Sequence, residues 1–356
     1  MSLRIFQPSS LGRGARIAAT GSYLPAHVVT NAELARRGAP LTDDEIVRLS
    51  GIRSRHYAAD DEATSDLAVQ ASRRALERLA KPRVDRLYLA TVSPDHPSPS
   101  AACIAQRALE LGDAPAMDLT ASCSGFLYAL DCAARAAVCG ETVLAVAADV
   151  RSRFIDPLDR ATCALFGDGA GAAVVKPCKP GEGIEAIGLF ADGTGARSVY
   201  VPAGGSREPA TAQTVATRRH TIRMEEGPQV YLAAVEGMLA AAEELLKATG
   251  RTFDDVALVV PHQPNRRILD RLAKLARLPE EKLFVNVDRI GNVSGATVAI
   301  AFDEALRAGR LKEDEEVLLL AAGAGYTAGA ALVRIDAELL AASRFDPAAT
   351  SSSAGT

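Results

Sequence analysis

The chain has 356 residues, of which 48% are hydrophobic and 24% are charged, and its formal net charge is −4. This composition is typical of a folded protein that is too long for one simple core and about right for two. The slightly acidic balance, without tryptophan or a basic cluster among aromatics, argues against general nucleic-acid binding. The first residues lack the apolar core of a signal peptide.

Helices and strands alternate along the first half of the chain. Apolar runs and helical periodicity predict a helix that follows Cys123, with further strands and helices on both sides of it. A Pro- and Gly-rich segment over 176–183 is the best candidate for a linker. The elements predicted in this half are a helix over 66–80, strands over 87–92 and 143–148, and a Gly-rich turn that feeds a strand over 166–177.

The alternation resumes after the linker. The uncharged stretch 317–333 contains three glycines, so it predicts strand–turn–strand rather than a membrane span. We therefore predict an α/β fold in two halves, 1–178 and 179–336, followed by a disordered tail over 337–356. The elements predicted here are strands over 184–189, 256–260, 283–287 and 317–321, helices over 230–248, 265–278 and 295–308, and an irregular stretch over 193–218.

The six cysteines contain no C-x-x-C pair, so their spacing predicts no zinc site. Cys132 and Cys139 fall two turns apart on one predicted helix, about 10 Å by helical rise, which is too far for a disulfide. This cysteine usage predicts a reducing, cytoplasmic location.

Cys123 lies in a small-residue elbow between an apolar entry and a predicted helix. Free N–H groups and the helix dipole at such a position favour an anion, and so a nucleophilic thiolate. The small neighbours Ser122, Ser124 and Gly125 leave room for a substrate carbonyl. A buried structural cysteine is the alternative, and the elbow alone does not decide between them.

Three predicted strands of the second half are followed by candidate site residues, two of them polar and the third a loop of small residues. His262 comes directly after a five-residue apolar strand, where α/β folds place their chemistry. Asn292 lies in a polar loop before a helix. The small-residue loop of Gly323, Ala324 and Gly325 can bring backbone N–H groups close to a ligand.

Seven motifs of the chain, which occur in the same order as in the family, resemble those of the β-ketoacyl-acyl-carrier-protein synthase III family of condensing enzymes. The resemblance implies a thiolase-like, five-layered αβαβα fold made of two duplicated halves, a homodimer, and no bound cofactor besides thioester substrates. The motifs are GIRSRHYA, PSAACIAQ, SCSGFLYAL, DPLDRATCALFGDGAGAAV, VVPHQPNRRI, DRIGNVSGAT and GAGYTAGAALV.

The resemblance also implies roles for individual residues. Cys123 would take an acyl group, with the backbone N–H groups of Cys123 and Ala324 holding the oxyanion. His262 and Asn292 would donate hydrogen bonds to the thioester carbonyl of a malonyl- or β-ketoacyl-carrier substrate. The resemblance further implies substrate or pantetheine contacts for Arg160, Asn265 and Ser98, and the basic stripe after His262 suits an acidic carrier protein through Arg266, Arg267, Arg271 and Lys274.

The chain departs from the family pattern where bulky residues are usual. Glu45 and Leu49 replace a Trp and an Arg that hold adenine, while Ser98 and Ala328 replace aromatic residues near the acyl tunnel. These changes favour a larger acyl group, delivered on a carrier protein, in polyketide or fatty-acid-type biosynthesis. Two other functions stay open: transfer of the Cys-bound acyl group to an alcohol or amine, and a non-catalytic partner that binds carrier protein.

Overall fold

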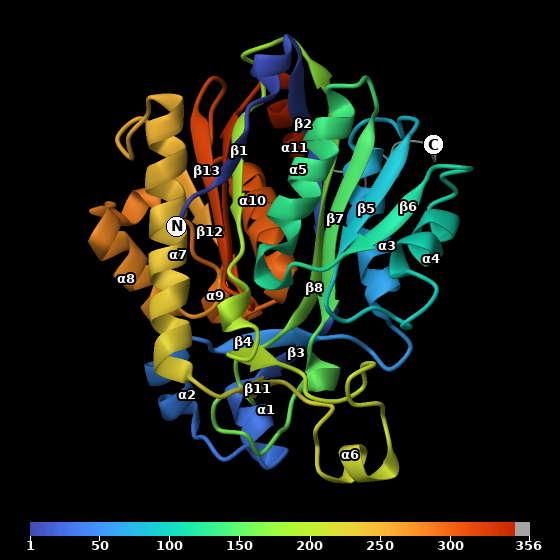
Figure 1. The fold of residues 1–356 in the computed structure, drawn as a ribbon, viewed down its shortest axis with the longest axis vertical. Helices are drawn as coiled ribbons and strands as arrows, with labels where there is room; N and C mark the ends of the chain where they lie inside the picture. Colours follow the sequence, from blue (N-terminus) through green and yellow to red (C-terminus); the bar gives the residue numbers. More distant parts are fainter. Residues whose placement is uncertain (346–356) are drawn as a thin grey trace, which may run out of the picture.

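The structure is a computed structural model that describes residues 1–345. Its two five-stranded sheets lie roughly face to face, with helices between them and on both outer sides (Figure 1). From one side to the other the layers are helix, sheet, helix, sheet and helix, as the sequence resemblance implies. No helix in this part of the chain is both long and apolar enough to cross a membrane.

The first sheet belongs to the N-terminal half. Its strands β5, β6 and β7 pair in parallel, whereas β8 pairs antiparallel with both β7 and β2. All eight residues of β7 are buried, because helices cover both faces of the sheet. In spatial order the strands are β2 (Gly14–Tyr23), β8 (Asp168–Cys178), β7 (Val143–Val150), β5 (Arg86–Ala90) and β6 (Ala116–Leu119).

The second sheet belongs to the C-terminal half, apart from one strand. Strand β1 comes from the start of the chain and pairs with β9, so the division after residue 178 does not separate the two sheets completely. The predicted strand–turn–strand over 317–333 is confirmed as the antiparallel pair β13 and β14. In spatial order the strands are β1 (Arg4–Phe6), β9 (Ile184–Phe190), β14 (Thr327–Arg334), β13 (Glu316–Gly323) and β12 (Leu258–Pro261).

Helices α5 (Gly125–Ala137) and α10 (Thr297–Arg307) form the layer between the sheets. Their buried apolar side chains join those of both sheets in one cluster. This shared core is why the halves do not behave as separate domains. The N-termini of the two helices lie near each other, which brings the loops before them together.

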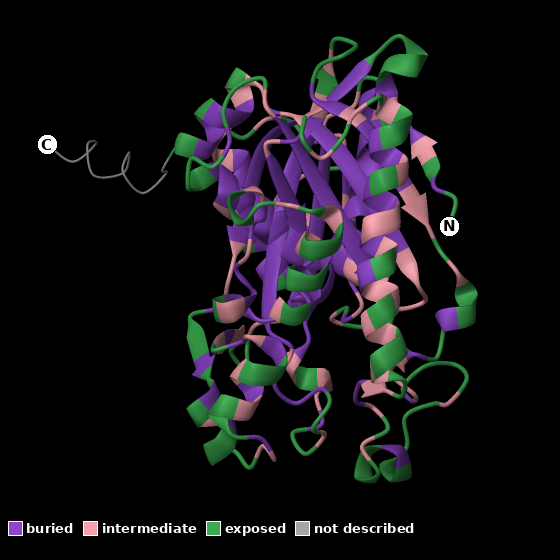
Figure 2. Cartoon of the chain, turned by 90° about the vertical axis from the view of Figure 1, so that its left-hand side faces the viewer, coloured by how far each residue is buried: buried purple, intermediate pink, exposed green. Residues whose placement is uncertain are grey.

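Amphipathic helices cover the outer faces. Helices α3 (Thr64–Glu77) and α4 (Ala101–Ala108) lie on the first sheet, whereas α7 (Gly227–Thr249) and α8 (Arg266–Ala276) lie on the second. Figure 2 views the molecule from the side of α7 and α8 and shows the buried interior behind their exposed outer faces. Each sheet thereby gains an outer apolar cluster in addition to the central one.

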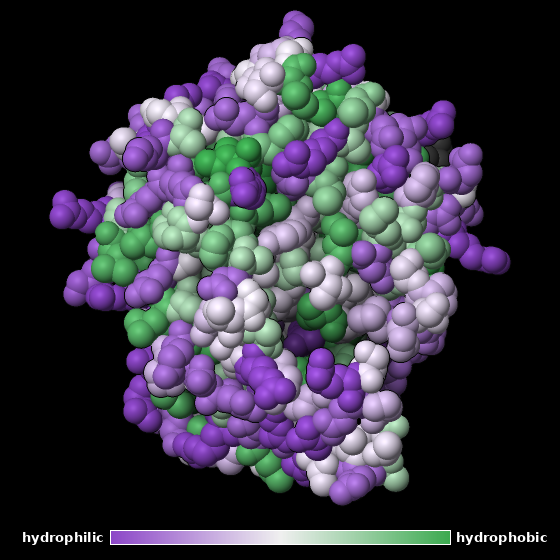
Figure 3. Space-filling model, viewed as in Figure 1, coloured by the Kyte–Doolittle hydropathy of each residue, from purple (hydrophilic) through white to green (hydrophobic). Residues whose placement is uncertain are grey.

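Short elements gather beyond the end of the sheets where Cys123 lies. Hydrophilic residues prevail on this lower part of the molecule in Figure 3. Some of these elements fall within the stretch 193–218 that the sequence predicts to be irregular. They are α1 (Asn31–Arg36), α2 (Asp43–Ser50), β3 (His27–Thr30), β4 (Ser54–Tyr57), β10 (Val199–Tyr200), α6 (Ala212–Ala216), β11 (Arg223–Met224) and α9 (Val287–Ile290).

The strand predicted over 283–287 is wrong. Leu283 makes a single parallel bridge to Val259, and then the chain turns into α9. The turn has a specific cause, because the buried side-chain oxygen of Gln263 accepts the backbone N–H of Asn286 at 3.1 Å. That N–H is therefore not available to a strand ladder.

The disordered tail predicted over 337–356 is wrong for its first part. Residues Ala337–Arg344 form α11, which Asp336 caps by accepting the N–H of Leu339 at 2.8 Å. Leu339 and Leu340 are buried against β2 and α10. Residues 346–356 of the predicted tail lie outside the described residues.

Candidate active site

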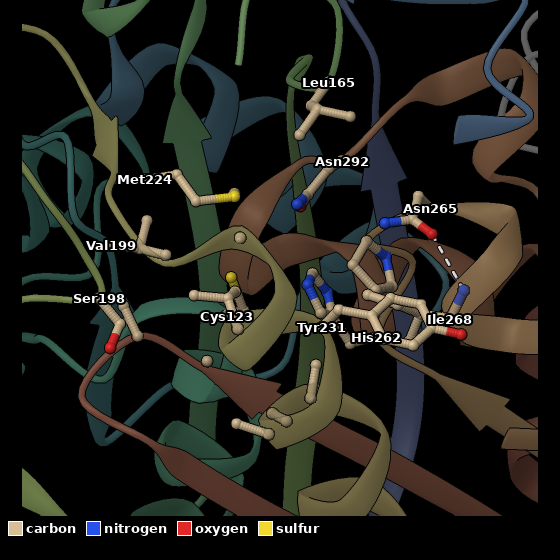
Figure 4. A pocket seen from close by; sticks show the side chains of 18 of the residues that line it. Cys123, Leu165, Ser198, Val199, Met224, Tyr231, His262, Asn265, Ile268 and Asn292 are labelled. Carbon is tan, nitrogen blue, oxygen red and sulfur yellow. Dashed lines mark hydrogen bonds between the residues drawn. The ribbon is translucent and has the colours of Figure 1, made fainter. Parts of the chain in front are cut away.

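A pocket of about 1100 Å³ opens between the two halves of the chain, at the ends of α5 and α10. Cys123, His262 and Asn292 all line it, although Cys123 is 139 residues from His262 and 169 from Asn292 along the sequence. In Figure 4 their side chains gather around one space. The structure thus brings together the three residues that the sequence singles out as catalytic.

Cys123 lies in a single 3-10 turn, Ser122–Ser124, between β6 and α5. Ser124 is the N-cap residue of α5, so the thiol lies just ahead of the free N–H groups of that helix. The small-residue elbow predicted from the sequence is therefore present. The side chain of Cys123 is partly exposed to the pocket.

Close backbone contacts explain the glycines around Cys123. A β-carbon on Gly323 would lie only 2.7 Å from the backbone nitrogen of Cys123, and one on Gly295 would lie 2.9 Å from the carbonyl oxygen of Ser122. Only glycine permits these approaches. The next residue after Gly323 is Ala324, whose backbone N–H makes no hydrogen bond within residues 1–345. The loop thus has a free donor beside the elbow of Cys123.

Three loops of the pocket hold non-glycine residues with positive φ. Ser122, Ser294 and Tyr326 have φ of 50°, 49° and 43°, and all three line the pocket. L-residues rarely adopt this region, and the resulting strain of about 1–3 kcal/mol persists only where the surroundings enforce it. Each residue belongs to a turn next to a candidate catalytic group, so part of the backbone strain of the described chain lies at the site.

The amide group of Asn292 is oriented by its own loop. Its side-chain oxygen accepts the backbone N–H of Ser294 at 2.8 Å, which leaves the amide nitrogen for a ligand. Figure 4 shows this nitrogen directed into the space near Cys123. The backbone of Asn292 is itself fixed by bonds with Leu165 and Gly167. Asn292 is thus a fixed hydrogen-bond donor.

His262 follows β12 and is 2% exposed. Its Nδ1 lies 2.5 Å from the hydroxyl oxygen of Thr297, the first residue of α10. The hydroxyl has one proton, for which the carbonyl oxygen of Ser294 at 3.1 Å is a second acceptor. When the hydroxyl donates to the nearer Nδ1, the neutral ring carries its proton on Nε2 and can donate it to a ligand. Burial lowers the pKa of His262 to about 3. The ring is therefore neutral at physiological pH and a weak base.

The effect of the surroundings on Cys123 differs from the sequence-based expectation. Burial raises the pKa of the thiol above its ordinary value, while the positive charge of Arg151 and the hydroxyls of Ser122 and Ser294 act in the opposite direction. The position ahead of α5 therefore does not by itself give a stable thiolate. Ionisation has to be assisted by groups in the pocket.

The residues expected to bind substrate have different positions. Asn265 lines the pocket and also caps α8 by accepting the N–H of Ile268 at 3.0 Å. Arg160 lines the pocket mouth, but its guanidinium is held by Glu45 at 3.0 Å. Ser98 is exposed and does not line the pocket of this chain. Asn265 and Arg160 thus line the pocket, whereas the role of Ser98, which the resemblance places at the acyl tunnel of a partner subunit, stays a prediction.

The basic stripe expected on α8 is present in part. Arg267, Arg271 and Lys274 are exposed and form no ion pair within the described part of the chain. Arg266 differs, because its guanidinium pairs with Asp270 at 2.6 Å. Arg267 also lines the mouth of the pocket, where it faces the ring of Tyr231. The stripe therefore consists of three unpaired cations, with Arg267 nearest to the site.

Sequence reasoning missed three residues of the site. Arg151 comes directly after a buried strand, which is a signal that the sequence does contain. Thr297 gave no distinct signal in the sequence, because threonine is common at the start of helices, where it often caps them. Gly237 lies inside α7, yet a β-carbon there would be 3.6 Å from those of Ala322 and Ala328. These small residues form one wall of the pocket.

Comparisons with known proteins agree with this site. The family described as 3-Oxoacyl-[acyl-carrier-protein (ACP)] synthase III matches residues 117–193, and its C-terminal counterpart matches residues 246–335. A β-ketoacyl-[acyl-carrier-protein] synthase III from Caldanaerobacter subterraneus subsp. tengcongensis is 44% identical over 90% of this chain and 97% of its own length. The chain belongs to the β-ketoacyl-acyl-carrier-protein synthase III family.

Solved structures extend this likeness to the fold. The 3-oxoacyl-[acyl-carrier-protein] synthase III from Aquifex aeolicus has a TM-score of 0.82 at 36% identity, over 90% of this chain and all of its own. The priming β-ketosynthase of the R1128 polyketide pathway has a TM-score of 0.83 at 34% identity, over 91% and 97% of the two chains. The fold is thus thiolase-like, and the protein is an acyltransferase of the synthase III type.

Proposed function

We propose that the protein first transfers an acyl group to Cys123. The sulfur attacks the carbonyl carbon of an acyl thioester, the bond from this carbon to the donor sulfur breaks, and the donor leaves as a thiol with the proton. The backbone N–H groups of Cys123 and Ala324 hold the oxyanion that forms in between. The close approach of Gly323 to the nitrogen of Cys123, and the free N–H of Ala324, support this arrangement.

The second step joins two carbon chains. His262 and Asn292 donate hydrogen bonds to the thioester carbonyl of a malonyl-type substrate, whose carboxylate leaves as CO₂. The resulting enolate carbon attacks the acyl carbonyl, a carbon–carbon bond forms, and Cys123 leaves as the thiolate. Two fixed donors aimed at one oxygen stabilise the negative charge where it develops. A β-ketoacyl thioester is the alternative second substrate. It would lose a proton in place of CO₂ and so would need a base, a role for which the neutral His262 is poorly suited.

The orientation of Asn292 carries this proposal. Its oxygen is occupied by Ser294, so the group turned toward the pocket is a donor. Transfer to an alcohol or amine would instead need a base to remove a proton from the acceptor. His262 is poorly suited to that role because burial holds its pKa near 3. A non-catalytic carrier-binding partner would not need Cys123 within the same pocket as both donors.

The partners follow from the same reasoning. An acidic acyl carrier protein would dock at Arg267, Arg271 and Lys274 and pass its pantetheine arm past Asn265 and Arg160. Pairing of Arg160 with Glu45 supports a carrier-bound donor over a nucleotide-bearing one, because that cation is already engaged. A homodimer, a cytoplasmic location and the absence of a bound cofactor stay predictions, as does the proposed size of the acyl group.

The test separates the two steps in an Asn292→Asp variant. We expect this variant to acylate Cys123 at nearly the wild-type rate, as measured by intact-protein mass. Formation of the β-ketoacyl product from malonyl-carrier protein should fall about 100- to 1000-fold, as on loss of one donor to a developing oxyanion. An equal loss in both steps would contradict the donor role. Acyl transfer to an alcohol or amine at rates above condensation would favour the alternative function.

A further inference from the structure

A buried arginine without an ionic partner lines the same pocket. Arg151 directly follows β7, is 7% exposed, and lies with Cys123 on the wall of the cavity. Within residues 1–345 its side-chain Nε has no hydrogen-bond partner, and its Nη1 donates one long hydrogen bond of 3.5 Å to the carbonyl oxygen of Val92. The fold therefore satisfies little of the hydrogen-bonding capacity of this guanidinium.

The carboxylates nearest in sequence are engaged elsewhere. Asp149 accepts bonds from the hydroxyls of Thr91 and Ser93 and from the backbone N–H groups of Val92 and Gly295. Asp168 accepts bonds from the backbone and hydroxyl of Ser152 and from the backbone of Ala58.

No carboxylate in residues 1–345 forms an ion pair with Arg151. Its guanidinium instead lies 5.7 and 5.6 Å from the ring centres of Phe154 and Phe166.

Such a group is costly to bury. An arginine keeps its charge inside proteins, and a buried charge is normally paired or fully hydrogen-bonded. Contacts with two aromatic rings offset only part of the lost hydration. A cation left in this state at the wall of a ligand pocket indicates that the ligand supplies the counter-charge.

We propose that Arg151 binds a carboxylate at the far end of the acyl group, so that the donor is an ω-carboxyacyl thioester. The inference rests on the proposed acylation of Cys123. The bonds made and broken in the transfer are those described above, and the distal carboxylate passes through the step unchanged.

Two other uses of Arg151 are less consistent with the pocket. The malonyl carboxylate must leave as CO₂, and a cation that bound it would stabilise the ground state and slow the reaction. A role as counter-ion to the Cys123 thiolate is compatible with the position of Arg151, but it would help every acyl donor equally. The two functions therefore differ in donor selectivity.

The experiment uses matched pantetheine thioesters that differ only at the distal end: succinyl against butyryl, and glutaryl against pentanoyl. The rate of Cys123 acylation is followed by intact-protein mass. For the wild-type protein we expect a preference of about 10-fold or more for the carboxylated donor of each pair.

In Arg151→Leu, acylation by the carboxylated donors should fall at least about 30-fold, as when one partner of a buried charge pair is removed. Butyryl and pentanoyl transfer should fall at least about 10-fold less, because these donors lose only the positive charge beside the Cys123 thiol, and Arg151→Lys should restore part of the selectivity.

The matched control is Arg153→Leu, two residues away. Arg153 is exposed, and in the described part of the chain its side chain hydrogen-bonds to the backbone carbonyls of Ala59 and Asp60, so its loss should not change donor preference. Melting temperatures of the variants show whether each still folds.

Equal losses for both donor types in Arg151→Leu would assign Arg151 to the thiolate and overturn the proposal. So would a wild-type preference for the alkyl donors.

If the proposed function itself is wrong, the acylation experiment gives a different result. In that case no thioester of either kind would acylate Cys123. Binding of free succinate and glutarate, measured by calorimetry on wild type and Arg151→Leu, then decides the inference. Binding that depends on Arg151 supports the anion site, whereas no binding, or binding unchanged by the substitution, overturns it.

Discussion

At the scale of single residues, burial sets the chemistry of the site. His262 is buried, which lowers its pKa and keeps its ring neutral, and Asn292 cannot titrate at all. Both donors to the thioester carbonyl are therefore unaffected by pH across the physiological range. Cys123 is the group of the three whose ionisation changes, and burial makes its thiolate harder to form.

This difference predicts the pH dependence of the second step. Because the pKa of His262 is lowered to about 3, its ring stays neutral at every pH above that value. Condensation starting from preformed acyl-enzyme should thus be flat between about pH 5 and 8, where an ordinary histidine would titrate. The measurement is single-turnover product formation from acylated protein and malonyl-carrier protein. A fall in rate centred near pH 6.5 would show that His262 is protonated there.

At the scale of elements, one helix serves two purposes. The buried face of α8 holds Ile268, Leu269 and Leu272 against the second sheet. Its opposite face carries the three unpaired cations beside the pocket mouth. The same periodicity that fixes the helix in the fold thereby presents a charged surface near the site.

Charge reversal on this surface should affect only carrier-bound substrate. Arg267→Glu is expected to raise the KM for malonyl-carrier protein about 10-fold or more at low salt, with kcat for a short pantetheine mimic unchanged. High salt should reduce the difference, because it screens exposed charges.

Arg266→Gln is the control, since Arg266 is already paired with Asp270 and should matter little for docking. Similar effects of the two substitutions on carrier use would speak against a docking role specific to Arg267.

At the scale of the whole molecule, the two halves are joined by shared layers. Strand β1 crosses to the second sheet, and α11 returns from the end of the described chain to pack on β2 and α10. Cys123 comes from one half, while His262 and Asn292 come from the other. The relative position of the halves therefore decides whether the site exists.

The return of α11 makes a prediction for stability. Leu339 is 1% exposed, so Leu339→Ala should lower the free energy of unfolding by about 2–5 kcal/mol. Arg344→Ala, on the exposed end of the same helix, should change it by no more than about 0.5 kcal/mol. Chemical denaturation of both variants provides the measurement. Equal stabilities would mean that α11 contributes nothing to the fold.

The sequence by itself determined the alternation of strands and helices, the fold class and the three central residues of the site. Local patterns sufficed because apolar strand runs, the elbow at Cys123 and the polar loops around His262 and Asn292 are each continuous in the chain. The motifs that resemble the family carried the same residues in order. Most expected elements therefore appear within a few residues of their predicted bounds.

Only the tertiary structure decided the features that depend on contacts between distant segments. Gln263 diverts the chain at Asn286, and a buried face makes a helix of residues that look like a loose tail. Burial also decides the protonation of His262 and leaves Arg151 without an ionic partner at the pocket wall. Solvation and hydrogen bonding of a side chain are set by what packs around it, and no local stretch of sequence contains that information.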